Sequence, residues 1–337
     1  MIKPTNRFPP IQKDIKKVFL PLYVSCYSRG WRQRKIREWG NKGGKMKREI
    51  RLAVRGLYDL QKIRIQIGNR LHNHYLNKLG VEPSEEKDKT IGWLTERLKE
   101  EHKRIVDGML HEKNLIKNLS RILGTEKGLI STETEFALSS AYLHLCEDEE
   151  RQIKFLKKLL EDIPVYNSFL KEVKGIGPQM AGVIISEFDI TKAKYVSSLW
   201  KYAGLDVVVT ADGEVMGRRM SKKCCKVIEY IAKNGEKKER LSLTYNPFLK
   251  SKLLGVLAKS FIKLRSPYRK FYDDYKHRLQ NHPKHKNKSK GHIDNMAKRY
   301  MIKMFLIDLY VKWRELSGLP VYPSYAEGKL EIKHKAG

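Results

Sequence analysis

The stretch of sequence that decides the fold runs from residue 169 to residue 188 and reads FLKEVKGIGPQMAGVIISEF. Apolar residues on both sides of its centre indicate two helices, and the central G-I-G-P indicates a tight turn between them. Pro178 suits the first position of the second helix, because the N–H that proline lacks would be unpaired there. We therefore predict a helix-hairpin-helix in which Ala181, Ile184 and Ile185 face inward.

The turn of this hairpin has the chemistry of a phosphate site. Glycines without a Cβ let an anion approach the backbone, and the free N–H groups and dipole of the second helix favour negative charge. Lys174 can add a charged donor. Such a turn holds DNA by its backbone rather than by its sequence. The alternative is a simple tight turn between two packed helices. The predicted DNA contacts of the hairpin are Lys174, Gly175, Ile176, Gly177 and Gln179.

The charge of the chain indicates the same class of partner. Its 337 residues include 69 Lys and Arg against 38 Asp and Glu, a net charge of +31 at pH 7. The excess lies mainly in residues 1–50 and 218–300, whereas residues 82–172 are nearly balanced. Concentrated positive charge indicates binding faces for an anionic partner, with nucleic acid first and a membrane surface second. No apolar stretch is long enough for a membrane-spanning helix, so we expect no membrane partner.

Hydrophobic spacing predicts a mainly α fold with one or two small β-hairpins. Four regions are expected: a basic N-terminal arm over 1–45, a helical, coiled-coil-like spacer over 46–165, the helix-hairpin-helix domain over 166–320, and a tail over 321–337. The expected helices cover 46–79, 88–122, 132–144, 151–174 with a break at Pro164, a helix starting at Asn246-Pro247, a helix from Ser266-Pro267 to Asn281, and 293–317.

Two β-hairpins are expected after residue 205. The first has strands over 206–210 and 214–216. The second has strands over 226–230 and 239–245, joined around Asn234-Gly235, a strong turn dipeptide.

Three motifs follow one another through the second half of the chain. They are KGIGPQMAGVIISEFDI at 174–190, SSLWKYAGL at 197–205 and RLSLTYNPFLK at 240–250. Together they resemble the C-terminal domain of the insertion-sequence one-ten family of transposases, to which Piv-type DNA invertases also belong. That domain carries a GIG-type hairpin, a phrase like L-x-x-Y-A-G-L, and a serine before Asn-x-x-Leu-(Lys/Arg). The resemblance covers residues 165–317.

The resemblance implies an enzyme of an insertion sequence that cuts and joins DNA strands through a serine nucleophile, which becomes covalently attached to DNA. The matching position is Ser242. It also implies DNA as partner, a structured non-coding RNA as guide, and a homo-oligomer. We expect a cytoplasmic protein of a prokaryote, associated with the nucleoid. The four cysteines, which show no framework spacing, fit a reducing compartment.

Members of this family begin with a ribonuclease-H-like domain in which four acidic residues bind metal. An early strand with an embedded aspartate would mark that domain, and this sequence has none. We therefore predict no metal ligands in this chain and expect magnesium only if another chain supplies an acidic site. Glu187 with Asp189 is a weak metal candidate, more often a solvated helix end. Cys224-Cys225 is weaker still, because adjacent cysteines cannot form the usual zinc chelate.

Alternation along the second predicted hairpin places Arg240, Ser242 and Thr244 on one face. A serine that attacks a phosphodiester needs its proton removed and the developing charge stabilised. Arg240 and the helix that starts at Asn246 could stabilise the charge, and the general base is open between Glu239, Asp212 and a partner's carboxylate. Four further cations are expected to clamp DNA: Arg218, Arg219, Lys222 and Lys223.

A different class of function fits the same residues. Ser242 can be an ordinary polar residue of a strand. The chain is then a non-catalytic DNA- or RNA-binding protein that has retained the transposase hairpin domain.

Overall fold

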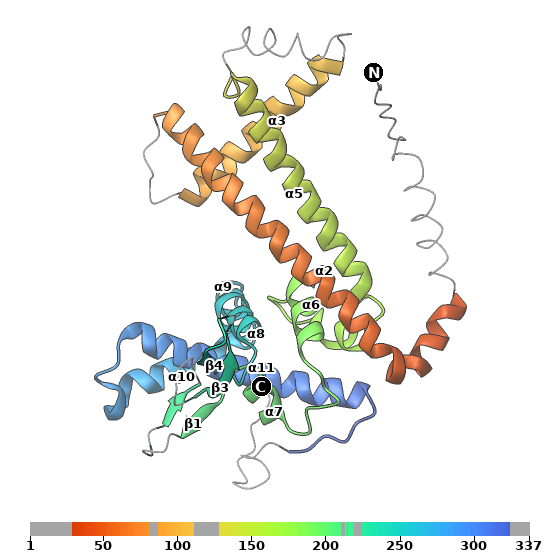
Figure 1. Ribbon diagram of the computed structural model, residues 1–337, viewed down its shortest axis with the longest axis vertical. Coiled ribbons are helices and arrows are strands. Elements are labelled where there is room, and N and C mark those ends of the chain that lie inside the picture. Colours follow the sequence, from red (N-terminus) through yellow and green to blue (C-terminus); the bar gives the residue numbers. More distant parts are fainter. Residues whose placement is uncertain are drawn as a thin grey trace. The chain divides into compact units, whose positions relative to one another are not determined.

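The computed structural model describes residues 29–80, 87–110, 128–209, 213, 215–218, 224–232 and 234–323, and these are mainly helical. The predicted fold class is confirmed (Figure 1). The helical elements are α2 (Arg29–Lys78), α3 (Lys87–Leu110), α5 (Glu133–Leu160), η1 (Tyr166–Leu170), α6 (Pro178–Glu187), α7 (Val196–Tyr202), α8 (Pro247–Ser251), η2 (Lys252–Leu257), α9 (Ala258–Lys263), α10 (Arg269–Asn281), η3 (Pro283–His285) and α11 (Lys290–Leu316). Among the described residues, no helix is long and apolar enough to cross a membrane.

The strands of the described residues pair into two antiparallel hairpins. β1 (Val207–Val209) pairs with β2 (Val215–Gly217), and β3 (Lys226–Ile231) pairs with β4 (Lys237–Ser242). Both predicted hairpins are therefore present, although β4 begins and ends earlier than expected.

The chain divides once, between Glu49 and Ile50, so that the boundary between the two compact units lies within α2. The expected arm over 1–45 lies partly outside the described residues. The expected boundary between spacer and hairpin domain, at residue 165, falls inside the second unit and stays a prediction.

Two predicted helices, 132–144 and the first part of 151–174, form the single helix α5. The acidic run between them continues the helix. Within this run, the carboxylate of Glu149 accepts hydrogen bonds from Gln61 and Arg64 of α2. The break expected at Pro164 is confirmed, because α5 ends at Leu160 and the chain continues as the short helix η1.

The far end of the spacer has its own apolar core. Side chains from α2, α3 and α5 share it, together with the two residues before the start of α5 that lie at 129 and 130. The buried members are Leu71, Tyr75, Leu76, Leu94, Leu98, Ile105, Leu129, Ile130, Tyr142 and Leu143.

The helix α6 packs directly against the spacer. A Cβ on Gly182 would lie 2.8 Å from Cγ2 of Val54 on α2 and 3.2 Å from both Cδ atoms of Leu156 on α5. This close approach explains the glycine, because a larger residue would push the three helices apart. The inward face predicted for Ala181 and Ile184 is confirmed, since both are 0 % exposed.

A second core lies on the other side of the hairpin and is aromatic. Phe305 of α11 contacts Phe169 of η1, Phe261 of α9 and Tyr268, with ring centroids 6.1, 5.5 and 5.4 Å apart. The helix expected to open at Ser266-Pro267 begins at Arg269 instead, after a turn that contains Tyr268.

A capping box begins α5. The hydroxyl of Thr132 accepts a hydrogen bond from the N–H of Glu135, at 3.2 Å, and the Glu135 carboxylate accepts in return from the N–H of Thr132. This carboxylate also accepts from Lys78 Nζ at 2.7 Å and His74 Nε2 at 2.8 Å. Burial raises the pKa of Glu135. The hydrogen bonds from Lys78, His74 and Ser131 outweigh this effect and lower the pKa to about 2.

A Glu135→Gln variant should therefore lose stability in a pH-dependent way. A depressed carboxylate pKa contributes stability that is complete above the unfolded value near 4.5 and is lost as the pH falls toward 2. We expect the variant to be less stable than the wild type by about 3 kcal/mol at pH 6, with the gap closing below pH ~4. Urea unfolding across this range measures it, with the exposed carboxylate variant Glu150→Gln as control. A gap that is independent of pH would contradict the assignment.

Candidate functional site

The carboxylate of Glu187, the last residue of α6, is the meeting point of three chain segments. It is 4 % exposed. Its Oε1 accepts from Arg55 Nη2 of α2 at 2.7 Å, and its Oε2 accepts from Asn246 Nδ2 at 2.6 Å. The Arg55 guanidinium also stacks on the ring of Phe248 in α8, 3.4 Å from its centroid. The end of the hairpin helix is thus bonded to both α2 and the start of α8.

Asn246 joins the second and third sequence motifs. Its N–H donates to the carbonyl of Tyr202 at 2.8 Å, and Gly204 (φ +65°) lies against Tyr245, where a Cβ would be 2.6 Å from the ring. The predicted start of α8 is confirmed, with Asn246 as N-cap and Pro247 at the first turn. The Asn246 side chain accepts from the first turn of α8, so this helix start offers less to a phosphate than the sequence indicated.

The two glycines of the hairpin turn have different roles. Gly175 has φ +105°, and a Cβ there would lie 2.9 Å from Cδ1 of Phe261. The Ser260 hydroxyl donates to the Gly175 carbonyl at 2.8 Å, so this glycine is required by the fold. Gly177 has an extended backbone (φ −92°, ψ 174°), and a Cβ there would meet nothing within 4 Å. The fold therefore leaves open space in front of Gly177.

The other predicted DNA contacts of the hairpin also divide into exposed groups and groups that make internal hydrogen bonds. Lys174 is exposed at the turn. The N–H of Ile176 closes the turn on the carbonyl of Val173 at 3.0 Å. The Gln179 side chain is half-buried and donates to Gln61 of α2 at 3.4 Å. The exposed groups of the turn are therefore Lys174 and the backbone at Gly177.

The pairing of β3 with β4 separates charge between the two faces of the ribbon. Side chains alternate along a strand, so the register defines each face. The basic face consists of Lys226, Ile228, Tyr230, Lys238, Arg240 and Ser242. The acidic face consists of Val227, Glu229, Ile231, Lys237, Glu239 and Leu241. None of the six residues of the basic face is acidic, whereas two glutamates oppose each other on the acidic face.

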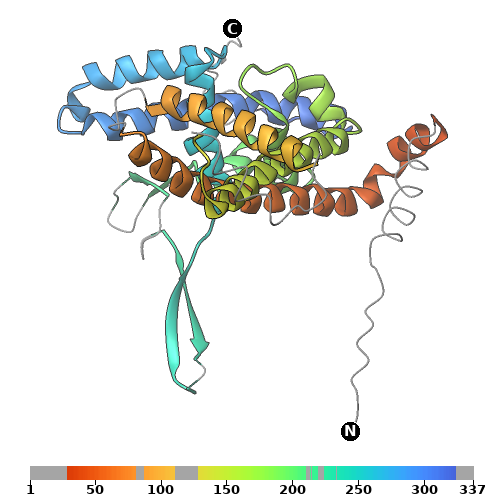
Figure 2. The same ribbon diagram turned by 90° about the horizontal axis from the view of Figure 1, so that it is seen from above.

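Both faces of this ribbon are open to solvent. Every residue of β3 is exposed, and so is every residue of β4 except the half-buried Ser242. Figure 2 shows the two strands as a ribbon that extends away from the helices of the same unit. Such a two-stranded ribbon has the dimensions that fit a DNA groove.

Ser242 lies at the inner end of the basic face. Its cross-strand partner is Lys226. The Arg240 guanidinium lies over the ring of Tyr230, 5.6 Å from the centroid, and Tyr230 is farther along the ribbon from Ser242. Lys226, which was not among the predicted site residues, is thus the cation directly opposite the serine. Only the register reveals it, and the register depends on the turn.

That turn is a three-residue loop. The N–H of Ala232 donates to the carbonyl of Glu236, and the N–H of Gly235 donates back to the carbonyl of Ala232, both at 2.8 Å. Gly235 has φ +82°, as expected for the glycine that ends such a loop. A two-residue turn would shift the pairing by one residue and move Ser242 away from Lys226.

The expected alignment of Thr244 with Ser242 is wrong, because β4 ends at Ser242. The Thr244 hydroxyl instead accepts from Arg218 Nη1 at 2.5 Å and donates to the carbonyl of Cys224. Arg218 also binds both oxygens of Asp206, at 2.8 and 2.7 Å, so its donors serve internal bonds. Glu239 lies on the acidic face, so its side chain is on the other side of the ribbon from Ser242. The remaining predicted clamps and the alternative base lie outside the described residues: Arg219, Lys222, Lys223 and Asp212.

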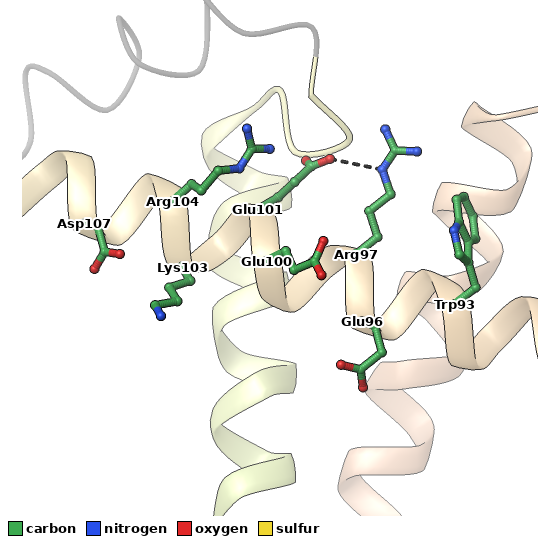
Figure 3. A pocket seen from close by; sticks show the side chains of 8 residues that line it. All are labelled: Trp93, Glu96, Arg97, Glu100, Glu101, Lys103, Arg104 and Asp107. Atoms are coloured by element: carbon green, nitrogen blue, oxygen red, sulfur yellow. Dashed lines mark hydrogen bonds and ion pairs between the residues drawn. The ribbon is translucent and has the colours of Figure 1, made fainter.

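Neither a metal-ligand group nor the hollow along α3 provides a second site among the described residues. Within the described parts of the chain, no group of His, Cys, Asp and Glu could hold a metal ion, and Glu187 is bound by Arg55 and Asn246. A hollow of about 800 Å³ lies along α3 (Figure 3). Its lining mixes acidic and basic side chains, and Arg97 pairs with Glu101 at 3.3 Å, so no set of like groups converges on a ligand. The hollow is lined by Trp93, Glu96, Arg97, Glu100, Glu101, Lys103, Arg104 and Asp107.

Comparison with known proteins identifies the hairpin region. Residues 167–229 match the family model described as Transposase IS116/IS110/IS902 family. The match covers this segment and not the rest of the chain. No curated protein and no solved structure matches the chain.

The matched segment contains the hairpin, α7, β1, β2 and the first residues of β3. Ser242 and Asn246 follow the matched residues in sequence. The structure connects both to the matched segment, because Ser242 pairs with Lys226 of β3 and Asn246 binds Glu187 of α6.

The two turn glycines should respond differently to substitution. We expect Gly175→Ala to lower the free energy of unfolding by about 2–4 kcal/mol, because it combines a positive φ with a clash against Phe261. Gly177→Ala should cost less than about 1 kcal/mol, the loss of a glycine N-cap. Urea unfolding of both variants measures the difference, and equal losses would contradict the distinct roles.

Proposed function

We propose that this protein is a transposase that cuts and joins DNA strands with Ser242 as nucleophile. The observation that carries the proposal is the β3–β4 register, which puts Ser242 at the inner end of a face with three cations and no acid. The match of residues 167–229 to a transposase family supports the reaction class, and a transposase is expected to bind DNA.

In the proposed reaction, Ser242 Oγ loses its proton and attacks the phosphorus of a phosphodiester. A serine–phosphate ester forms, the bond to one strand oxygen breaks, and that oxygen leaves as a hydroxyl after taking up a proton. Because one ester replaces another, the hydroxyl of a second strand can reverse the step and join the strands. Lys226, opposite the serine, and Arg240 stabilise the charge that develops on the phosphate.

The basic face contains no group suited to accept the serine proton. We propose that a second copy of the chain or another partner chain supplies the base, in keeping with the homo-oligomer that the family resemblance implies. The same resemblance supports a structured non-coding RNA as guide. Magnesium belongs to the proposal only through an acidic site on such a partner.

The hairpin turn is proposed to hold the DNA backbone independently of sequence. Lys174 is exposed there, and the space in front of Gly177 lets a phosphate reach the start of α6. Gly177→Ala is expected to leave the fold intact and to weaken binding to duplexes of different sequence by the same factor. A loss restricted to one sequence would argue against a phosphate clamp.

Ser242→Ala should abolish a covalent protein–DNA adduct while leaving DNA binding within about twofold, because only the attacking oxygen is removed. The adduct is measured on denaturing gels with labelled insertion-sequence ends, with and without candidate guide RNAs. Ser251→Ala, at an exposed serine on α8, is the control. If the wild type forms no adduct with any end, partner or RNA, the chain is instead a non-catalytic DNA- or RNA-binding protein.

Two adjacent lysines of β4 test which face of the ribbon contacts DNA. Lys238 belongs to the basic face and Lys237 to the acidic face. Lys238→Gln should lower the slope of log K against log salt by about 0.9, and affinity at low salt by about 3- to 5-fold, through the loss of one phosphate contact. Lys237→Gln is the matched control and should change little. Equal effects of the two variants would rule out a face-specific contact.

A further inference from the structure

A group of cations converges at the base of the β1–β2 hairpin. Arg218 follows β2, Lys250 lies on α8, and Arg299 and Lys303 lie one turn apart on α11. Lys250 Nζ donates to the carbonyl of Arg218 at 2.5 Å. Among the described residues, Asp206 is the carboxylate that offsets their charge, and both of its oxygens already bind Arg218.

Two donors in this group are buried and have no hydrogen-bond partner among the residues that the structure describes. One is Nε of Arg299, and the other is Nε1 of Trp200 on α7. Lys303 connects them, because it is one turn from Arg299 and its Nζ lies 5.1 Å from the centroid of the Trp200 ring. Buried donors are almost always paired, so these two indicate an acceptor that the described part of the chain does not supply.

The β1–β2 hairpin leaves space for the Arg299 side chain at a glycine. Arg299 Nη1 packs against Gly217 of β2 so closely that a Cβ there would collide with it. The glycine thus leaves room for the guanidinium beside the strand. An arginine that only extended into solvent would not need this space.

The charges of the group are poorly compensated. Burial lowers the pKa of Arg299, and burial with the neighbouring charge of Arg299 lowers the pKa of both Lys303 and Lys250. Cations held close together away from water destabilise each other unless an anion is bound between them. Arginine and lysine with an indole N–H form a set of donors that suits phosphate oxygens.

We propose that Arg299, Lys303, Lys250 and the indole N–H of Trp200 form a binding site for a phosphate group, supplied by the backbone of a nucleic acid. Arg218 links this phosphate site to the ribbon, because it binds Thr244, two residues beyond Ser242. A strand anchored here would therefore pass the foot of the basic face. The inference rests on the proposed function only for nucleic acid as the source of the phosphate.

The first test uses the full chain and inorganic phosphate or pyrophosphate, with chloride at equal ionic strength as reference. At roughly tenfold excess over its Kd, the anion should raise the Tm of the wild type by about 3 °C. Lys303→Met should melt higher than the wild type in chloride, because a repulsive charge is gone, and should lose the response to phosphate. Lys263→Met, at an exposed lysine on α9, should keep it. An equal response in all three proteins overturns the proposal.

Trp200→Phe provides a milder variant, since it keeps the buried ring and removes only the N–H. It should weaken phosphate binding about threefold, in line with the loss of one hydrogen bond. A folded Trp200→Phe protein with wild-type phosphate affinity would remove the indole from the site and contradict the assignment.

The second arm identifies the source of the phosphate. If a nucleic acid backbone occupies the site, Arg299→Gln should lower the salt slope for duplex DNA or RNA by about 0.9, and inorganic phosphate should compete with the oligonucleotide. If free phosphate is the ligand, the variant loses the Tm response but binds oligonucleotides like the wild type. Because every readout is binding or melting, failure to form a Ser242 adduct leaves this test unaffected.

Discussion

The buried carboxylate of Glu187 is the constraint on which the arrangement of the second unit depends. A buried charge must be paired, and its partners must be held in place. Arg55 fixes α2 to the end of α6, and Asn246 fixes the start of α8 to the same point. Asn246 also binds the carbonyl of Tyr202, so α7 is included. Arg55, 132 residues before Glu187, and Asn246, 59 residues after it, thus meet at one side chain.

This constraint also determines where the two hairpins begin and end. The chain leaves the Glu187 region after α7 and returns to it at Asn246. Everything between, including β1 to β4, is therefore anchored at both ends. The anchored base is where Arg218, Lys250 and Arg299 gather, whereas the β3–β4 ribbon is exposed on both faces. The proposed binding groups thus lie on this anchored base and on a ribbon that no other described element covers.

The two glycines of the hairpin turn, two residues apart, differ in what the fold requires of them. Gly175 is explained within the fold by its positive φ and by Phe261, while nothing in the fold requires Gly177. From the sequence, both glycines fitted the same phosphate-binding interpretation. The distinction needs the aromatic core of α9 and α11, which comes from a part of the chain nearly a hundred residues later.

The sequence by itself determined the local features: the fold class, the hairpin turn, the break at Pro164, the cap at Asn246, and the existence of both β-hairpins. Each depends on interactions within a few residues, so its signal is contained in the local pattern. The tertiary structure alone decided the continuity of α5, the internal role of Arg218, the pairing of Ser242 with Lys226 and the cluster around Arg299. The ribbon register depends on loop length, and one residue more or less exchanges its faces. The other three depend on which distant side chains satisfy a charge, and sequence spacing carries no record of such partners.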